Sequence, residues 1–101
     1  MGLDATDAAS ATETQIQQAG LSSTVGVTPM IGINDTNTEI FQLSDAQTLL
    51  NFAIANKYVT RLAMWPVARD NGGCPNEGFA SPTCSGISQN NYQFSQIFEA
   101  F

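Results

Sequence analysis

The stretch that decides the fold is VGVTPMIGI, from Val25 to Ile33, which is apolar almost throughout. It shows no alternation of polar and apolar residues, and such continuous runs are typical of parallel strands that are covered on both faces. A second run, VTRLAMWPV, extends from Val59 to Val67. Each run contains a proline, Pro29 or Pro66, which lacks an amide hydrogen and interrupts strand pairing. The sequence therefore predicts two buried parallel strands.

Helical patterns precede and separate these strands. Residues 4–19 are rich in alanine, with weakly apolar positions three and four apart, and Gly20 follows as a candidate left-handed cap. Ser44 and Gln47 have the spacing of a capping box, and the apolar face that follows them ends near Asn56. We predict a helix over each of these segments.

The rest of the chain completes an alternating pattern. Residues 34–42 are polar and predict a loop, residues 69–89 predict a long second loop, and a last helix is expected from about residue 91. The order helix, strand, helix, strand, helix indicates βα units around a parallel sheet. Two strands do not make a covered sheet alone, so further strands must be supplied. The last helix would carry an apolar stripe, which would form an exposed hydrophobic patch if its packing partners are missing. The stripe consists of Phe94, Ile97, Phe98 and Phe101.

The charge balance excludes two classes of partner. The net charge is −6, and only Lys57, Arg61 and Arg69 are positive. Three scattered cations do not displace the counterions of nucleic acid, and an anionic membrane surface is disfavoured for the same reason. No apolar run approaches the roughly 20 residues of a membrane span. A neutral partner such as a sugar fits this composition.

The two cysteines, Cys74 and Cys84, lie close together in a loop rich in Gly, Pro and Ser. A disulfide would stabilise this short loop by roughly 2–3 kcal/mol and would indicate an oxidising, extracellular compartment. The alternative is a pair of free thiols. Zinc is disfavoured because two thiolates without any histidine do not complete a tetrahedral site. We expect no metal and no cofactor.

Five blocks of the chain together resemble the bacterial and fungal family-18 glycoside hydrolases of the chitinase type. Any one block alone would be weak, but the series covers nearly the whole chain and is quite specific. In chain order they are VTPMIGIND (27–35), TEIFQLSDAQTLLNFA (38–53), RLAMW (61–65), ARDN (68–71) and CSGISQNNYQFSQIF (84–98).

The resemblance implies a fold and a substrate. The family has an eight-stranded (β/α) barrel, a TIM barrel, and residues 25–33 and 59–67 match its seventh and eighth strands. Residues 1–101 would then be a single unit, the C-terminal part of a catalytic barrel, completed by self-association into a homo-oligomer or by missing chain. The implied substrate is chitin or a chito-oligosaccharide, a β-1,4-linked N-acetylglucosamine polymer. The family's catalytic motif, Asp-x-x-Asp-x-Asp-x-Glu, is absent from the sequence, so no catalytic residue is assigned.

Four substrate-binding residues are expected at the carboxyl ends of the two strands, where barrel sites are built. Trp65 matches the family's eighth-strand tryptophan, which forms the floor under the sugar at the cleavage point; the alternative is a core tryptophan. Met30 points into the barrel or its mouth, and core filling is the usual role of such a methionine. Asn34 and Asp35 follow the first strand, and side chains of this type bind sugar hydroxyls or form ordinary turns.

The remaining charged residues have weaker claims to the site. Arg69 and Asp70 follow the second strand, and we expect a local ion pair that shapes the loop. Asp35, Glu39 or Glu77 as the acid of a minimal hydrolase is a third interpretation. Two interpretations are preferred to it. In the first, the chain is a piece of an enzyme that is active only with the rest of its barrel. In the second, it is a non-catalytic protein that binds sugar or self-associates.

Overall fold

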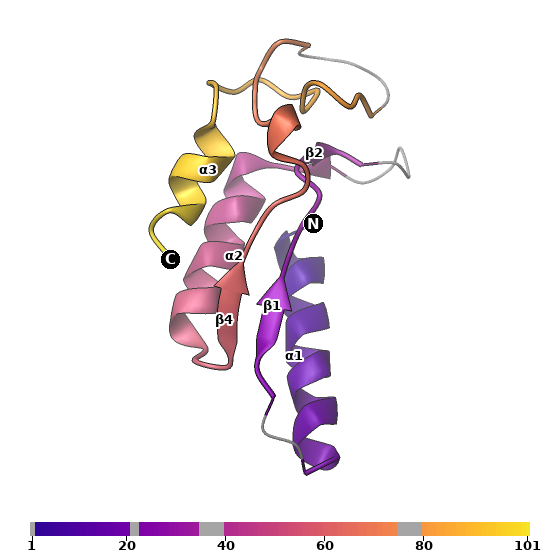
Figure 1. Ribbon diagram of the computed structural model, residues 1–101, viewed down its shortest axis with the longest axis vertical. Helices are drawn as coiled ribbons and strands as arrows, with labels where there is room; N and C mark the ends of the chain where they lie inside the picture. The colour runs from indigo at the N-terminus through magenta and orange to yellow at the C-terminus, as the bar shows by residue number, and fades with distance from the viewer. Residues whose placement is uncertain (1, 21–22, 35–39, 75–79) are drawn as a thin grey trace.

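The computed structural model describes residues 2–20, 23–34, 40–74 and 80–101, with side chains from residue 5 onward. Helices and strands alternate along these ranges, largely as the sequence predicts (Figure 1). In chain order the elements are α1 (Gly2–Gln18), β1 (Val25–Val27), β2 (Gly32–Ile33), β3 (Ile40–Phe41), α2 (Leu43–Ala55), β4 (Val59–Leu62), a 3-10 turn η1 (Val67–Arg69) and α3 (Gln93–Phe98). Within the described ranges, no helix is long and apolar enough to cross a membrane.

The strands β1 and β4 form a two-stranded parallel sheet, which confirms the predicted α/β class and the parallel pairing. The amide of Val25 donates to the carbonyl of Tyr58 at 2.8 Å, and the amide of Ala63 donates to the carbonyl of Val27 at 3.0 Å. Backbone groups of a strand alternate in direction, so the odd-numbered residues of β1 face β4. The even-numbered residues therefore direct their backbone groups to the opposite edge.

Both strands are shorter than the predicted ranges 25–33 and 59–67, and Pro29 gives a physical reason. In this ladder the next amide to face β4 would be that of residue 29, and proline has no amide hydrogen. The Pro29 carbonyl still accepts from the amide of Trp65 at 2.9 Å. Beyond it, the pairing continues only as an isolated parallel bridge between Met30 and Trp65.

The chain leaves this ladder at Gly32, where φ is +73°. It then forms a short antiparallel pair, in which Gly32 faces Phe41 and Ile33 faces Ile40. The sequence predicted only a polar loop over 34–42, and this prediction is wrong at its end. Phe41 is fully buried in the core, so the hydrophobic effect holds β3 in place despite its polar neighbours.

The helix α2 was expected to begin with a capping box between Ser44 and Gln47, but it begins earlier. Its N-cap is Gln42, whose backbone amide donates to Oδ2 of Asp45 at 2.8 Å. Ser44 lies inside the first turn, where its carbonyl accepts from the hydroxyl of Thr48. The spacing of a box is preserved two residues earlier, because the Gln42 side chain in turn accepts from the backbone amide of Asp45.

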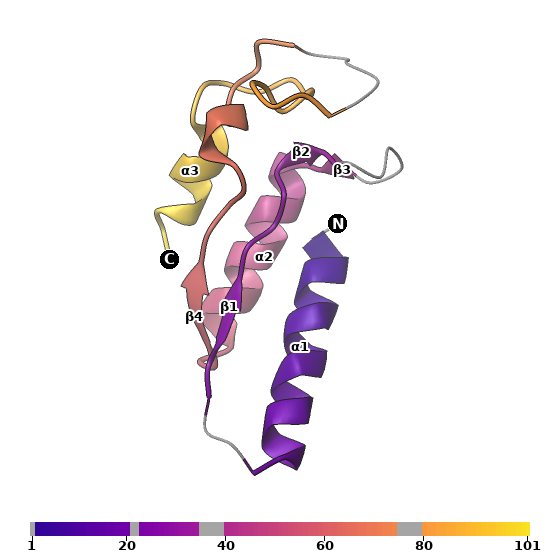
Figure 2. The ribbon, with the colours of Figure 1, turned by 45° about the vertical axis from the view of Figure 1, so that its right-hand side comes forward.

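The helices α1 and α2 lie on the same side of the β1–β4 sheet (Figures 1 and 2). The other face of the sheet, turned to the viewer in Figure 1, carries no helix in the described part of the chain. In this single chain the sheet is therefore covered on one face only, and the expected covering of the second face would have to come from further strands. The Cα radius of gyration is 14.2 Å and the extents are 45 × 27 × 18 Å, against a radius of about 13 Å for a compact domain of this length.

The core fills the space between the sheet and the helices. The C-terminal stripe packs into it: Phe94 and Phe98 are buried, and the rings of Phe94 and Phe41 lie 6.1 Å apart. Of the expected exposed hydrophobic patch, Phe101 is the residue that stays exposed, at 44%. The buried cluster consists of Ile31, Phe41, Ala46, Leu49, Phe94 and Phe98.

Candidate functional site

Trp65 lies at the carboxyl end of the parallel sheet. Its carbonyl accepts from the amide of Ile31 at 3.1 Å, and it is paired in a parallel bridge with Met30. These backbone contacts fix the position of the residue, while its side chain is 51% exposed. Trp65 is therefore not part of the buried cluster of the described chain.

A hollow of about 240 Å³ opens beside the Trp65 indole. It brings together two of the predicted site residues, Met30 and Trp65, with groups that come from the loop after β4. Its walls are mostly apolar, with a hydroxyl and a guanidinium as the polar groups, as in small-ligand sites generally. The lining residues are Met30, Trp65, Pro66, Arg69, Ala80, Ser81 and Pro82.

The far wall of this hollow belongs to the loop that the disulfide closes. Cys74 and Cys84 are bonded, with 5.9 Å between their Cα atoms, which confirms the predicted disulfide. The Ser81 hydroxyl hydrogen-bonds the Thr83 hydroxyl and accepts from the Thr83 amide, both at 3.3 Å. Sequence reasoning missed this wall, although a clipped loop directly after the tryptophan strand is a signal that could have indicated it.

Arg69 also lines the hollow, although the sequence analysis did not count it among the substrate-binding residues. It is 1% exposed, and its guanidinium donates to three backbone carbonyls: Cys84 at 3.0 Å, Ile33 at 2.6 Å and Ser85 at 3.3 Å. Because these carbonyls belong to β2 and to the end of the clipped loop, the Arg69 side chain ties the loop to β2 while it also lines the hollow. Arginine suits this role because its planar group presents several donors in a fixed geometry.

Asp70 is equally buried but binds a different part of the chain, so the expected Arg69–Asp70 ion pair is not how these residues shape the loop. Its carboxylate accepts from the amides of Phe94 at 3.0 Å and Ser95 at 2.9 Å, and from the Ser95 hydroxyl at 2.7 Å. It also accepts from the Gln89 side chain at 2.8 Å. A carboxylate at this point satisfies free amides at the start of α3.

The other predicted polar site residues are not gathered at the hollow. Asn34 is 8% exposed, and its side-chain amide donates to the carbonyls of Met30 at 3.2 Å and Gly32 at 3.0 Å. These contacts are those of a turn-forming residue. Asp35, Glu39 and Glu77 lie outside the described residues. The described acidic and cysteine side chains form no group that could hold a metal ion.

A larger hollow, about 410 Å³, runs between α1 and β1 and does not touch Trp65. It is lined by small side chains of α1, including Ala5, Ala8 and Thr12, and by the free edge of β1. Because this hollow lies beside strand backbone that is unpaired among the described residues, we interpret it as a gap next to the sheet and not as a ligand site. We therefore place the candidate site at Trp65 and not in the larger hollow.

Comparisons with known proteins agree with this fold, although no known protein-family model matches the chain. Active domain 2 of a chitinase from Pyrococcus furiosus, solved as catalytic site mutants, is 34% identical, with a TM-score of 0.87 over 98% of this chain. A probable bifunctional chitinase/lysozyme of Escherichia coli is 35% identical over 86 residues, which are 82% of this chain. The chain belongs to the chitinase family.

This member of the chitinase family corresponds to only part of its relatives. It spans 34% of the solved Pyrococcus chain and 9% of the Escherichia coli protein. Endochitinase 11 of Metarhizium anisopliae is 36% identical over 52 residues, which are 10% of that protein. A thermostable Pyrococcus furiosus chitinase domain complexed with chito-oligosaccharides is 41% identical, with a TM-score of 0.67 over 74% of this chain and 24% of that one.

Proposed function

We propose that this chain contributes a sugar-binding surface to a chitinase-type glycoside hydrolase, with Trp65 as the floor under an N-acetylglucosamine unit. The observation that carries the proposal is the half-exposed indole at the carboxyl end of two parallel strands. Barrel enzymes bind their substrates at this end of the strands. The substrate class is a β-1,4-linked N-acetylglucosamine polymer, which agrees with relatives named as chitinases.

The chemistry of the hollow supports a neutral sugar. One face of a pyranose ring presents C–H groups, which pack on an indole, while the hydroxyls point outward to polar partners. Met30 and Pro66 extend the apolar floor beside Trp65, and the Ser81 hydroxyl lies in the opposite wall. The chain's net charge of −6 would not attract an anionic ligand.

The proton donor is proposed to come from outside this chain, because the Asp-x-x-Asp-x-Asp-x-Glu motif is absent. The chain would then act as part of a barrel completed by other strands, from the rest of a catalytic domain or from further copies of itself. The disulfide fits a secreted protein. The missing motif also favours a second function, a non-catalytic protein that binds carbohydrate or self-associates.

Calorimetric titration of the purified chain with chito-oligosaccharides tests the sugar site. We expect Trp65→Ala to weaken binding at least tenfold, because it removes the indole on which the sugar would stack; this corresponds to about 1.4 kcal/mol or more. Val67→Ala is the matched control, since Val67 is 61% exposed two residues away and does not line the hollow. Equal affinities for wild type and Trp65→Ala would contradict the proposal.

Release of a chromophore from a labelled chito-oligosaccharide separates the catalytic alternatives. Binding without release supports a sugar-binding part whose proton donor lies elsewhere, or the non-catalytic function. Release by the chain alone that disappears in Glu39→Gln or Glu77→Gln would instead support the minimal hydrolase. Light scattering on the same samples gives the oligomeric state at which either result is obtained.

A further inference from the structure

Tyr92 is an exposed aromatic residue in a backbone conformation that tyrosine rarely adopts. Its φ is 61° and its ψ is 23°, in the left-handed region, where glycine and asparagine are usual and a bulky side chain is an outlier. The residue is 61% exposed, so burial of the ring does not compensate for this strain. Asn91, whose side chain tolerates the conformation better, lies one position earlier. The chain thus presents an aromatic ring to water at a position where a smaller residue would be more stable.

Backbone hydrogen bonds fix this position without using the ring. The Tyr92 amide donates to the Asp70 carbonyl at 2.7 Å, and the Tyr92 carbonyl accepts from the Gln96 amide at 3.0 Å. The amides of residues 92 to 95 are all bonded within the chain, so the start of α3 itself offers no donor to a ligand. The feature that the fold leaves unused is the aromatic ring.

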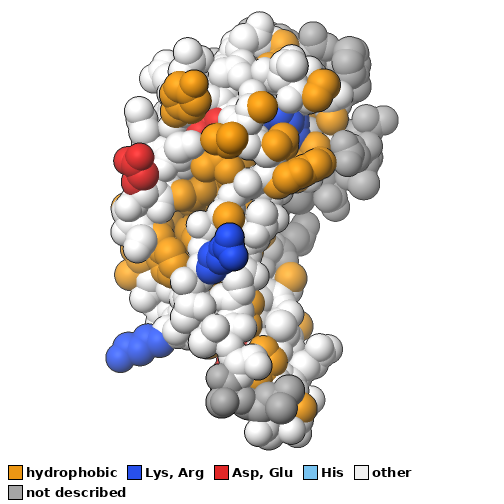
Figure 3. Space-filling model, viewed as in Figure 1, with side chains coloured by type: hydrophobic (Ala, Val, Ile, Leu, Met, Phe, Trp, Pro, Cys, Tyr) orange, Lys and Arg blue, Asp and Glu red, His pale blue; other side chains and the backbone are white. Residues whose placement is uncertain are grey.

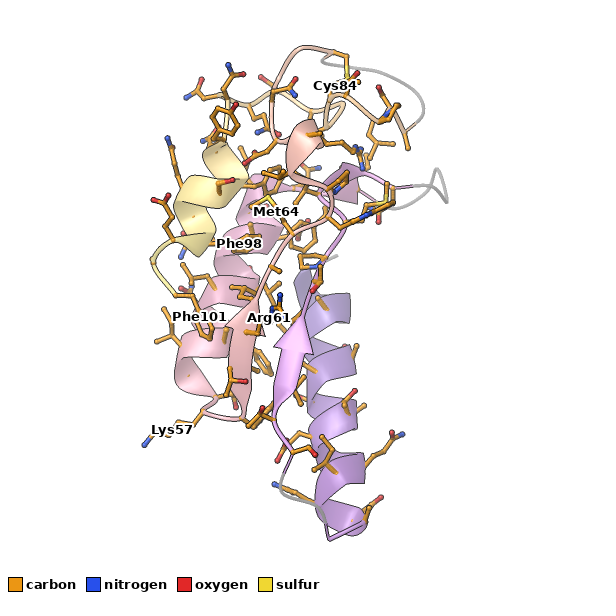
Figure 4. The ribbon with its side chains drawn as sticks, in the orientation of Figure 1. Lys57, Arg61, Met64, Cys84, Phe98 and Phe101 are labelled. Atoms are coloured by element: carbon orange, nitrogen blue, oxygen red, sulfur yellow. A yellow bond between two sulfur atoms is a disulfide. The ribbon has the colours of Figure 1, made fainter. Side chains whose placement is uncertain are left out.

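The ring belongs to the same framework as the Trp65 hollow, but Tyr92 does not line that hollow. Trp65 precedes the turn η1 and Asp70 follows it, and a rise of about 2 Å per residue separates the two backbones by on the order of 10 Å. Figure 4 shows Met64, the residue before Trp65, and Phe98 of α3 between β4 and α3, where both pack in the core. Tyr92 is therefore held at a fixed distance from Trp65, outside the hollow.

The surface around Tyr92 is uncharged. The sequence has no Asp, Glu, Lys or Arg from residue 78 to residue 98. Figure 3 shows mostly hydrophobic and uncharged polar side chains over the loop after β4 and the start of α3. Asn90 and Asn91, beside the ring in sequence, are exposed, and their amides both donate and accept hydrogen bonds. An aromatic face with neutral amides beside it suits a sugar, whereas a charged peptide or a nucleic acid would find no opposite charge among these residues.

We propose that Tyr92 is a second sugar-stacking residue, which binds an N-acetylglucosamine unit outside the Trp65 hollow, with Asn90 and Asn91 as hydrogen-bonding partners. This inference rests on the proposed function, because it extends the same binding surface to a longer stretch of polymer. Strained backbone persists at binding sites, where contact with the ligand and not stability selects the residue. A disaccharide fills only the hollow, and a chain of several units contacts both aromatic rings.

The first test separates sugar binding from stability. Tyr92→Asn removes the ring and relieves the backbone strain, so the urea midpoint should stay unchanged or rise. The affinity for a hexasaccharide of N-acetylglucosamine, measured by calorimetry, should fall by roughly threefold or more. Tyr92→Phe keeps the ring and should bind like the wild type. Phe101→Asn is the matched control, because it removes another exposed aromatic ring, beyond the other end of α3, and should leave the affinity unchanged. A lower urea midpoint for Tyr92→Asn, or an unchanged affinity for the hexasaccharide, would overturn the proposal.

The second test uses the length of the sugar to distinguish Tyr92 from the Trp65 site. The disaccharide should bind to Tyr92→Asn as tightly as to the wild type, whereas Trp65→Ala should weaken the binding of both sugars. If Tyr92→Asn weakens hexasaccharide binding and Trp65→Ala weakens neither sugar, the proposed function fails and this inference stands. The opposite pattern overturns this inference alone. Equal losses for both sugars in Tyr92→Asn would also overturn it, and a wild type that binds neither sugar would overturn both ideas.

Discussion

At the scale of single residues, Gly32 controls how the chain turns away from the parallel sheet. Its φ of +73° lies in the left-handed region, where other L-residues are strained by about 1–2 kcal/mol. A Cβ on Gly32 would also lie 2.6 Å from the Ser85 Cβ and in direct collision with the Ser85 carbonyl. That carbonyl accepts from the Ile33 amide at 2.8 Å, so it is not free to move aside.

We predict that Gly32→Ala lowers the free energy of unfolding by about 2–4 kcal/mol, because backbone strain and overpacking add together. Gly20→Ala is a closely matched control: its φ is +72°, but nothing lies within 4 Å of the added Cβ. That variant should lose only about 1 kcal/mol. Urea unfolding followed by circular dichroism measures both values, and equal losses would show that the collision with Ser85 has no energetic weight.

At the scale of elements, the loop after β4 is held at several points, and these contacts give the Trp65 hollow its far wall. Besides the disulfide, the Asn71 side chain donates to the carbonyl of Thr83 at 2.8 Å, and the Ser85 hydroxyl donates to the carbonyl of Asn71 at 3.1 Å. Arg69 and Asp70 extend the network to β2 and α3. The loop is therefore a built part of the fold and positions the groups beside the indole.

Replacing both Cys74 and Cys84 by Ser should lower the free energy of unfolding by about 2–3 kcal/mol, the loop-closure contribution for a bridge across 10 residues. Sugar binding should weaken as well, since Ala80, Ser81 and Pro82 lose their restraint. Urea unfolding with and without a thiol reductant measures the first effect; the reductant should change the wild type and leave the double variant unaltered. If the double variant unfolded at the same urea concentration as the oxidised wild type, hydrogen bonds alone would be shown to hold the loop.

Sequence reasoning found the elements better than their ends. The apolar runs predicted both parallel strands, because continuous apolar composition is typical of strands in a parallel sheet; the bridge between Met30 and Trp65 was not predicted. It missed β3, since burial of Phe41 depends on the distant Phe94 and on α2. It also missed the contribution of Arg69 to the hollow, which arises from carbonyls 15 to 36 residues away that no local pattern indicates.

At the scale of the whole molecule, the chain is a sheet with helices on one side only. The β1–β4 sheet has an open face and two free edges among the described residues, and its extents of 45 × 27 × 18 Å are those of a slab. Free edges of parallel sheets are uncommon, because such sheets are normally buried within larger α/β folds. The match to a third of a chitinase domain gives this shape a simple explanation.

This architecture predicts a definite pattern of amide hydrogen exchange. The amides of Gly26 and Thr28 point to the free edge of β1, so they should exchange almost as fast as in an unfolded peptide when the chain is alone. Those of Leu49 and Leu50, inside α2 and buried, should exchange more slowly by several orders of magnitude. Strand docking along the edge should slow the first pair at least tenfold without changing the second. Slow exchange of the Gly26 and Thr28 amides in a monomer would show that this edge is already occupied. The chain would then need no further strands to complete its sheet.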